Sequence, residues 1–408
     1  MTGQGHFIDK IQFTHDPLQD LDAITSATAM ASSEINAHLP FASGWIGYIS
    51  YDLGRWIEPA ATGSLLPSDD RNWPLIELAY CPEPLVYDNV EQQWYAVSDC
   101  DFASLFIEAN RNDVNFAVSP LQSDIDPDHY LTMISEAIKY IQAGDIFQAN
   151  ITQRLSANFS GSTRALYQEA MKISKAWYGA YMEFPNGRCI TSLSPELFLD
   201  ADFNNKKVTT RPIKGTRPIS VDKSELLESQ KDTAELHMIV DLMRNDLGRV
   251  CEYGSVKVPQ ARKIETHPTV HQGVAQITGT LRDDVTIADL LAATFPGGSV
   301  TGAPKIRAMQ IIDELEPTRR GPYCGAIGLF GDNGRINLNI AIRTIALNGK
   351  RDAGNWEQLI GTMDYSVGGG IVADSKPWEE YKESLDKAAV LQMVLEQTVF
   401  DRATQEIY

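Results

Sequence analysis

The chain has 408 residues, of which 35 are Lys or Arg and 54 are Asp or Glu, so its formal net charge at pH 7 is −19. Nucleic-acid phosphates bind clusters of basic side chains, and a chain this acidic is not expected to bind nucleic acid. Apolar residues make up 43% of the chain, which is enough for a hydrophobic core and excludes a disordered polymer.

Nothing in the sequence indicates a membrane or an export route. No apolar run approaches the roughly 18 residues that span a bilayer. Residues 1–6 show neither the basic region nor the apolar stretch of a signal peptide. The five cysteines are odd in number and widely spread, and none forms a Cys-x-x-Cys pair, which favours reduced thiols over disulfides or a zinc site. We therefore expect a cytoplasmic enzyme.

The N-terminal third is rich in turns. Small and aromatic residues alternate over 44–51, which predicts a strand, and clusters of Pro, Gly and Asp follow as far as residue 90. The polar stretch from Asn112 to Asp128 is the best linker candidate. We therefore expect an N-terminal portion at 1–120, packed into the same body as a catalytic domain at 121–408.

Helices and strands then follow without the regular order of a parallel sheet. Apolar residues at helical spacing predict helices over 130–141, Asp232–Arg249 and Pro377–Thr398, and Ile146–Leu155 is typical of a strand. Such a mixture favours an α+β fold with large antiparallel sheets.

A further strand is predicted over Asn337–Ile345. Apolar and polar residues alternate along it, so that Asn337, Asn339 and Arg343 share one face. Two amides and a guanidinium on one face predict the wall of a polar pocket.

Two pairs of carboxylates stand three residues apart on predicted helices. They are Asp232 with Glu235 and Glu380 with Glu383, and this spacing puts each pair on one helix face. Hard oxygens arranged in this way suit Mg²⁺, which takes one or two protein carboxylates. On spacing alone, two solvent-exposed acidic helix faces explain the pairs better than a metal site does.

Lys214 lies in a stiff and positively charged segment, Arg211 to Pro218. Two prolines restrict the chain, and Arg211 and Arg217 flank the lysine, whose protonated form nearby positive charge disfavours. A lysine with a depressed pKa can act as a nucleophile. A surface lysine in a tight turn explains the segment equally well.

Two glycine-dense runs, 295–305 and 368–370, can form backbone anion sites or sharp turns. Neither run matches a phosphate loop or a dinucleotide fingerprint. Glu196 is a candidate general acid if it is buried, and His271 is a second candidate for proton transfer. A lone Glu or His is more often structural.

Taken together, these segments resemble the chorismate-binding enzymes, a family that includes component I of anthranilate and aminodeoxychorismate synthases and the isochorismate and salicylate synthases. The matching stretches run in family order from about residue 130 to the C-terminus. They are 144–150, 194–196, 212–216, 238–249, 295–308, 342–344 and 368–375, with a weaker match at 44–55. The resemblance implies two antiparallel sheets packed face to face as a sandwich, with helices outside.

Within the family, two positions distinguish the reactions. Isochorismate and salicylate synthases carry a water-activating lysine where this chain has Gln148, and aminodeoxychorismate synthases carry a lysine in the Pro-Ile-x-Gly-Thr motif, as Lys214 here. The sequence is therefore most similar to the aminodeoxychorismate synthase branch. Anthranilate synthase component I and a non-catalytic chorismate-binding subunit are the alternatives.

The resemblance also implies roles for single residues. Glu196 would protonate the departing 4-hydroxyl of chorismate while Lys214 attacks C2, and ammonia would then add at C4. Mg²⁺ would be held by Glu235 and Glu383, supported through water by Asp232 and Glu380. The second carboxylate of chorismate would be held by Arg343, Tyr323, Gly368, Gly369 and Gly370. Lys305, His271 and Gln148 match further active-site positions of the family.

The resemblance further implies a partner, a separate glutaminase subunit that supplies ammonia. The segment Tyr323-Cys324-Gly325 lacks the glycine that a glutaminase nucleophile elbow requires, so we assign no glutaminase to this chain. Compared with the family, the chain is expected to begin late, at about Asp16. Together with the segment 176–180, which replaces a Pro-rich piece of some relatives, this disfavours a tryptophan site.

Overall fold

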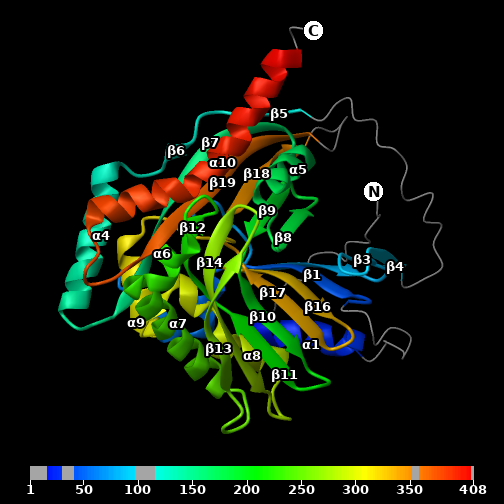
Figure 1. Ribbon diagram of the computed structural model, residues 1–408. Coiled ribbons are helices and arrows are strands. Elements are labelled where there is room, and N and C mark those ends of the chain that lie inside the picture. The colour runs from blue at the N-terminus through cyan, green and yellow to red at the C-terminus, as the bar shows by residue number, and fades with distance from the viewer. Residues whose placement is uncertain (1–15, 30–40, 97–114, 352–357, 406–408) are drawn as a thin grey trace.

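The computed structural model describes residues 16–29, 41–96, 115–351 and 358–405. Within these residues the strands form two large sheets and a two-stranded hairpin, and every pair of neighbouring strands is antiparallel (Figure 1). Helices cover the outer faces of the sheets, so the α+β sandwich implied by the family resemblance is confirmed.

The first sheet combines strands from the N-terminal part of the chain with strands from its second half. In the described residues its nine strands are β12 (Ile213–Pro218), β14 (Val270–Thr280), β11 (Lys207–Arg211), β10 (Leu197–Asp202), β17 (Arg335–Ile340), β16 (Ala326–Gly331), β1 (Gly44–Ile49) and β2 (Ile76–Cys81), in that order, with β13 (Lys257–Thr266) paired to β14. The N-terminal strands β1 and β2 therefore belong to the same sheet as strands that lie after residue 196.

The second sheet is built around the long pair β7 (Gln148–Ser162) and β19 (Gln358–Ile371). Its eight described strands are β15 (Gly302–Ala303), β7, β19, β18 (Thr344–Arg351), β9 (Arg188–Ser194) and β8 (Tyr178–Glu183), with β5 (Phe116–Val118) and β6 (Gln122–Ser123) along β7. The hairpin is β3 (Leu85–Asp88) with β4 (Gln93–Ala96).

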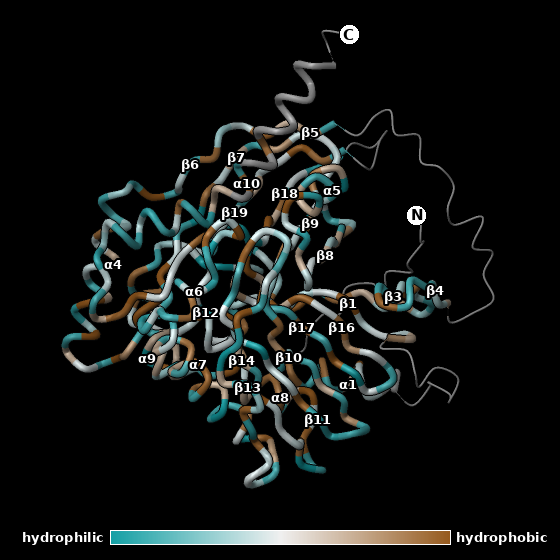
Figure 2. The backbone as a smooth tube through the Cα atoms, viewed as in Figure 1, coloured by the Kyte–Doolittle hydropathy of each residue, from teal (hydrophilic) through white to brown (hydrophobic). Residues whose placement is uncertain are grey.

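The helices pack by apolar faces. Against the first sheet lie α1 (Pro17–Ala29), α7 (Gln230–Gly248) and α8 (Ile287–Thr294); against the second lie α5 (Thr163–Ser174) and α10 (Pro377–Gln405); α4 (Pro127–Gln142) and α9 (Lys305–Leu315) pack beside β7. The short helices are α2 (Leu53–Ile57), η2 (Pro59–Ala61), α6 (Lys223–Glu228) and η4 (Gly298–Val300). Apolar stretches follow the inner strands and α8, and polar residues dominate the outer loops (Figure 2).

The predicted helices are found at their places. The strand predicted at 146–155 is the first part of β7, and the strand at 44–51 is β1. Of the predicted linker, residues 112–114 lie outside the described residues, and the rest forms β5, β6 and the start of α4. No helix of the described ranges combines the length and apolarity needed to cross a membrane.

The strand predicted over Asn337–Ile345 is wrong in its second half. β17 ends at Ile340, and the chain then crosses to the other sheet, where β18 begins at Thr344. The amide of Asn339 binds one backbone group in each sheet, donating to Tyr178 O of β8 at 2.7 Å and accepting from Ile327 N of β16 at 3.1 Å. The predicted pattern continued past the strand end because the crossover residues Ile342 and Arg343 are again an apolar residue followed by a polar one.

A second crossover lies directly beside the first. The chain leaves β9 at Ser194 and enters β10 at Leu197 in the other sheet. Ser194 Oγ donates to Ile340 O at 2.6 Å, and Ile340 N donates to Glu196 O at 3.1 Å. The two passages between the sheets are therefore joined by hydrogen bonds.

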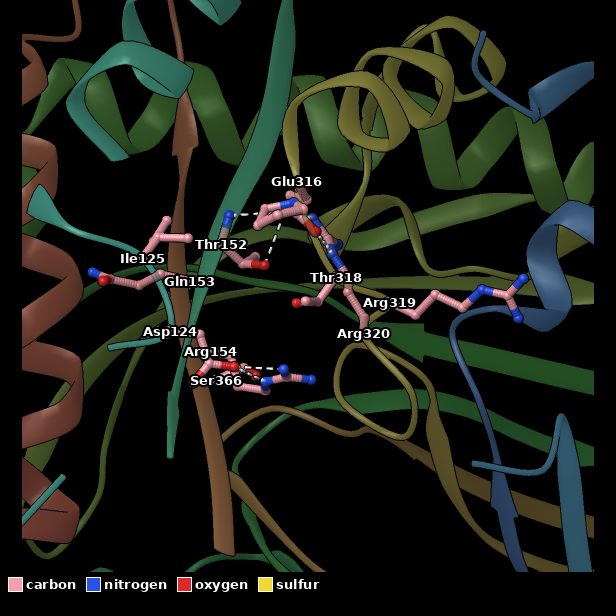
Figure 3. A pocket seen from close by; sticks show the side chains of 11 residues that line it. Asp124, Ile125, Thr152, Gln153, Arg154, Glu316, Thr318, Arg319, Arg320 and Ser366 are labelled. Carbon is pink, nitrogen blue, oxygen red and sulfur yellow. Dashed lines mark hydrogen bonds and ion pairs between the residues drawn. The ribbon is translucent and has the colours of Figure 1, made fainter. Parts of the chain in front are cut away.

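A buried ion pair fastens the loop after α9 to this framework. Arg320 donates to Glu316 at 2.6 and 2.8 Å and to the carbonyls of Val300 and Asn150 at 2.8 and 2.6 Å. Glu316 accepts in turn from Thr152 N and Oγ1. The pair borders a hollow of about 20 Å³, which has room for about one water molecule (Figure 3).

Removing Glu316 should destabilise the protein strongly. In Glu316→Ala the Arg320 guanidinium, only 2% exposed, would stay buried without its carboxylate, which costs about 3–5 kcal/mol of unfolding free energy. Urea unfolding measures this loss. Glu136→Ala, which breaks the exposed pair with Lys139, is the control and should change the value by less than about 1 kcal/mol. Equal losses of unfolding free energy in the two variants would contradict the conclusion that the buried Glu316–Arg320 pair stabilises the fold.

Candidate active site

A cavity of about 700 Å³ opens where the two crossovers face β12, β14 and β19. α7 and α10 close its other side, so that residues more than 200 positions apart in the sequence meet in the cavity. The lining residues that carry charge are Glu196, Lys214, Arg217, Lys231, Asp232, Glu235, Arg343, Glu380, Glu383, Asp386 and Lys387.

Lys214 is presented to the cavity by an irregular strand. The register between β12 and β14 shifts between Ile213 and Thr216, and Gly215 has a φ of +80°, a conformation that glycine adopts without strain. The Lys214 Nζ lies 3.4 Å from the carbonyl of Ser299. Burial lowers the pKa of Lys214, against the opposing effect of the Glu235 and Glu196 carboxylates.

Glu196 stands on the crossover between β9 and β10. It is 3% exposed, and its Oε1 is buried without a hydrogen-bond partner. Burial raises the pKa of its carboxyl to about 7, although Ser299 and Lys214 favour the charged form. An acid that is still partly protonated near neutral pH therefore lies near an amine whose own pKa is depressed.

Four carboxylates from two helices form the opposite end of the cavity. α7 begins after its cap Ser229, whose Oγ accepts from Asp232 N, and it presents Asp232 and Glu235. α10 presents Glu380 and Glu383 across from them. The i, i+3 spacing noted in the sequence therefore directs both pairs into one cavity.

Basic side chains partly balance these carboxylates. Arg217 lies 3.0 Å from Asp232, Lys231 lies 3.5 Å from Glu380, and Lys387 lies 2.8 Å from Glu383. Burial raises the pKa of Glu235; the nearby lysines oppose this effect and Asp232 adds to it. An additional cation between the helices would relieve the repulsion.

The donor set fits a hard divalent cation completed by other ligands. Within the described ranges no three His, Cys, Asp or Glu side chains converge closely enough to hold a metal by themselves. Mg²⁺ needs no such cluster, because it binds one or two carboxylates and keeps its other positions for water and substrate oxygens. Glu235 and Glu383 offer such a pair from facing helices.

The three glycines of β19 leave the floor of the cavity free of side chains. A Cβ on Gly368 would lie 2.3 Å from the Ile151 carbonyl, so the strand pairing itself requires glycine there. A Cβ on Gly369 would lie 3.5 Å from Glu380 Oε2, and one on Gly370 would lie 3.4 Å from Lys214 Nζ. Side chains at the last two positions would fill the space between the amine and the acids.

Arg343 and Tyr323 also line the cavity. Arg343 lies on the crossover from β17 to β18 with a φ of +51°, and its carbonyl accepts from Leu193 N at 2.9 Å. Tyr323 is 7% exposed and precedes Cys324, a buried residue with a φ of +62°.

Three of the sequence-predicted residues do not line the cavity. Lys305 binds Asp246 at 2.6 Å and the Thr294 carbonyl at 2.9 Å, so it ties α9 to α7 and α8. His271 is buried and pairs through Nδ1 with Thr266 Oγ1 at 3.0 Å. Gln148 is fully buried behind Gly370, whose Cβ would lie 2.5 Å from its Nε2.

Several lining residues were missed by sequence reasoning. On β14 the cavity is lined by Val270 and Gln272, which stand on either side of His271 in the sequence. Side chains alternate between the two faces of a strand, so these two share the face opposite to that of His271. Lys387 follows Glu383 by four residues on α10, a spacing typical of a helical ion pair that would have indicated it. Asn150 and Ser299 gave no local signal.

The raised pKa of Glu196 predicts a pH-dependent stability. Between its reference pKa of 4.5 and about 7, the carboxyl is ionised in the unfolded chain but protonated in the folded one, so rising pH favours unfolding. From pH 4.5 to pH 8 the wild type should lose about 3 kcal/mol relative to Glu196→Gln. Urea unfolding at several pH values measures the difference, and a constant difference would contradict the burial argument.

Comparison with known proteins agrees with this geometry. The family described as chorismate binding enzyme matches residues 5–393. The chain is 38% identical over 393 residues to aminodeoxychorismate synthase component 1 of Escherichia coli, covering 92% of this chain and 81% of that protein. It is also 38% identical over 384 residues to an anthranilate synthase component I-like protein of Synechocystis, covering 90% and 75%.

Among solved structures, anthranilate synthase component I from Streptococcus pneumoniae superposes with a TM-score of 0.78 at 31% identity, covering 94% of this chain and 86% of that one. The chain therefore belongs to the chorismate-binding enzymes.

Proposed function

We propose that the chain is the synthase subunit, component I, of an aminodeoxychorismate synthase. It would convert chorismate and ammonia to 4-amino-4-deoxychorismate, on the route to 4-aminobenzoate and folate. The observation that carries the proposal is the Lys214 amine in the cavity wall, with a depressed pKa, near the buried Glu196, whose pKa is raised to about 7. A depressed pKa increases the share of neutral amine, which is the nucleophilic form.

In the first half of the reaction the Lys214 nitrogen bonds to C2 of the chorismate ring. The displaced electron pair moves through the ring diene and the C4–O bond breaks. Glu196 gives its proton to the departing oxygen, which leaves as water. The product is a covalent adduct that contains chorismate less one water.

In the second half ammonia bonds to C4 and the electrons return through the ring. The C2–N bond to Lys214 then breaks, and the amine regains its free form. The added nitrogen loses a proton, which restores Glu196. The sum is chorismate and ammonia to 4-amino-4-deoxychorismate and water, with the enzyme unchanged.

The substrate carboxylates would lie at the two ends of the cavity. Mg²⁺ held by Glu235 and Glu383, with Asp232 and Glu380 in support through water, would neutralise the ring carboxylate. Arg343, which also lines the cavity, would offer two parallel N–H groups to the enolpyruvyl carboxylate.

Anthranilate synthase component I is the alternative reaction, and a relative with that type of name matches at the same identity. In that reaction nitrogen is added at C2 and pyruvate is eliminated. Lys214 favours the first proposal, because a lysine bonded to C2 would block amination at that carbon.

A glutaminase subunit that supplies the ammonia is part of the proposal. The name component 1 of the Escherichia coli relative implies a second component there. We expect ammonium at high pH to replace that partner in vitro, because the residues proposed for the ring chemistry all lie in this chain.

Replacing Lys214 tests the reaction directly. With chorismate, Mg²⁺ and ammonium, the wild type should form 4-amino-4-deoxychorismate, detected as 4-aminobenzoate after a downstream lyase. Lys214→Ala should lower this rate by more than about 10²-fold, as should Lys214→Arg, because the guanidinium stays charged and cannot attack. Without ammonium, mass spectrometry of the quenched wild type should find chorismate less one water on Lys214.

Formation of anthranilate and pyruvate would assign the chain to the alternative reaction. Product formation by Lys214→Arg at the wild-type rate would refute the covalent step. If ammonium gave no product but an added glutaminase subunit restored it, the expectation of a self-sufficient synthase site would fail.

The magnesium assignment has its own test. Glu235→Gln should raise the Mg²⁺ concentration required for half-maximal activity by about tenfold or more, since a neutral amide is a weaker ligand than a carboxylate. Thermal unfolding of the chorismate-free protein over a Mg²⁺ titration gives a second readout. Asp386→Asn, which alters another cavity carboxylate, is the matched control, and an equal shift in both variants would contradict the assignment.

A further inference from the structure

The acidic end of the cavity, formed by Asp232, Glu235, Glu380 and Glu383, already holds a cation of the protein itself. Lys231 lies in the first turn of α7. Its Nζ lies 4.0 Å from Glu235 Oε1 on the same helix and 3.5 Å from Glu380 Oε1 on α10. One ammonium therefore lies between carboxylates that come from both helices, and Glu235 is one of the two proposed magnesium ligands.

Helix geometry by itself gives no reason for a lysine at this position. The first turn of a helix carries partial positive charge, which favours acidic side chains and disfavours lysine. Within α7 the lysine precedes its glutamate by four residues, whereas the opposite order stabilises a helix better. The shorter of the two contacts is the one to Glu380 on the other helix. The carboxylates that meet in the cavity therefore explain the position of Lys231 better than α7 does.

Lys231 is held more loosely than the other basic side chains of the acidic end. Its side chain is 55% exposed, and in the part of the chain that the structure describes its ammonium pairs with these two carboxylates alone. Lys387, by contrast, also donates to the carbonyl of Gly368 at 2.9 Å. Arg217 also donates to the carbonyl of Thr216 at 3.0 Å. Lys231 can therefore move into solvent without breaking a bond to the backbone.

The carboxylates that Lys231 contacts are fixed independently of it. Glu380 is 5% exposed, and its Oε1 also accepts from Ser375 Oγ at 2.7 Å. Mg²⁺ binds carboxylate oxygens at about 2.1 Å. A divalent ion on these oxygens and the ammonium between them would repel each other at close range. The lysine and the metal therefore compete for the same carboxylates.

Resting on the proposed magnesium site, we propose that Lys231 is a built-in competitor of Mg²⁺ for that site. In the metal-free protein the ammonium bridges Glu235 and Glu380, and on metal binding the side chain moves into solvent. The exchange replaces one positive charge by two. The acidic end therefore gains the positive charge that attracts the carboxylates of chorismate only when the metal is bound, and the lysine keeps the two helices together until then.

Lys231→Met tests the inference, because methionine keeps an unbranched side chain and removes the charge. Calorimetric titration of the chorismate-free protein with Mg²⁺ should give a Kd about fivefold lower than that of the wild type, which corresponds to the loss of one partly exposed ion pair. Lys231→Arg should not lower the Kd, because the guanidinium stays charged and binds carboxylates well.

Thermal unfolding supplies a second readout that needs no activity. In a chelator the thermal midpoint of Lys231→Met should lie below that of the wild type, because the facing carboxylates have lost a shared cation. At saturating Mg²⁺ the two midpoints should converge, because the wild type has then released the lysine as well. A purely structural role of Lys231 would instead lower the midpoint equally under both conditions, and that result would overturn the inference.

Lys376→Met is the matched control. It removes the same charge beside α10, but Lys376 pairs with the exposed Glu379 outside the cavity lining. An unchanged or raised Kd for Mg²⁺ in Lys231→Met would overturn the inference. An equal fall of the Kd in Lys376→Met would also overturn it, because the effect would then be one of general charge.

The same titrations separate this inference from the proposals on which it rests. If neither the wild type nor Lys231→Met bound Mg²⁺, the proposed magnesium site would fail and the inference with it. If both bound Mg²⁺ with the same Kd, the inference alone would fail. Formation of a product other than 4-amino-4-deoxychorismate would refute the proposed reaction, whereas a lower Kd in Lys231→Met would still support the competition, since chorismate is absent from that measurement.

Discussion

The cavity depends on the hydrogen bonds that join the two crossovers between the sheets. At a crossover the chain leaves one strand ladder before it enters the next, so its backbone groups need other partners. Here the two crossovers supply them to each other, through Ser194 Oγ to Ile340 O and Ile340 N to Glu196 O. Leu193 N adds a third bond, to Arg343 O. These bonds hold Glu196 and Arg343, which are distant in the sequence, on adjoining parts of one wall.

Burial then determines the chemistry of the two central groups. It raises the pKa of Glu196 to about 7 and lowers the pKa of Lys214, so the pKa values of the two groups move towards each other. Each group favours the charged form of the other, yet desolvation is the larger effect at both. A proton donor and a neutral amine can therefore exist side by side, which neither residue would provide in water.

The acidic end of the cavity follows from helix geometry and from the meeting of two helices. Residues three apart on α7 and on α10 share a face, and the packing of both helices around the cavity directs these faces to the same space. Lys231 and Lys387 partly balance the carboxylates. A strongly acidic chain thus concentrates part of its charge where a cation and an anionic substrate can be held together.

The sequence by itself determined the helices α4, α7 and α10, the strand β7 and the importance of Lys214 and the carboxylate pairs, because periodicity and local spacing carry these features. The tertiary structure alone decided where the chain changes sheets, and so ended the strand at Ile340 and placed Glu196 beside Lys214. It also decided that Gln272, rather than His271, faces the cavity. β14 is buried on both faces over 271–275, so no alternation in the sequence distinguishes them.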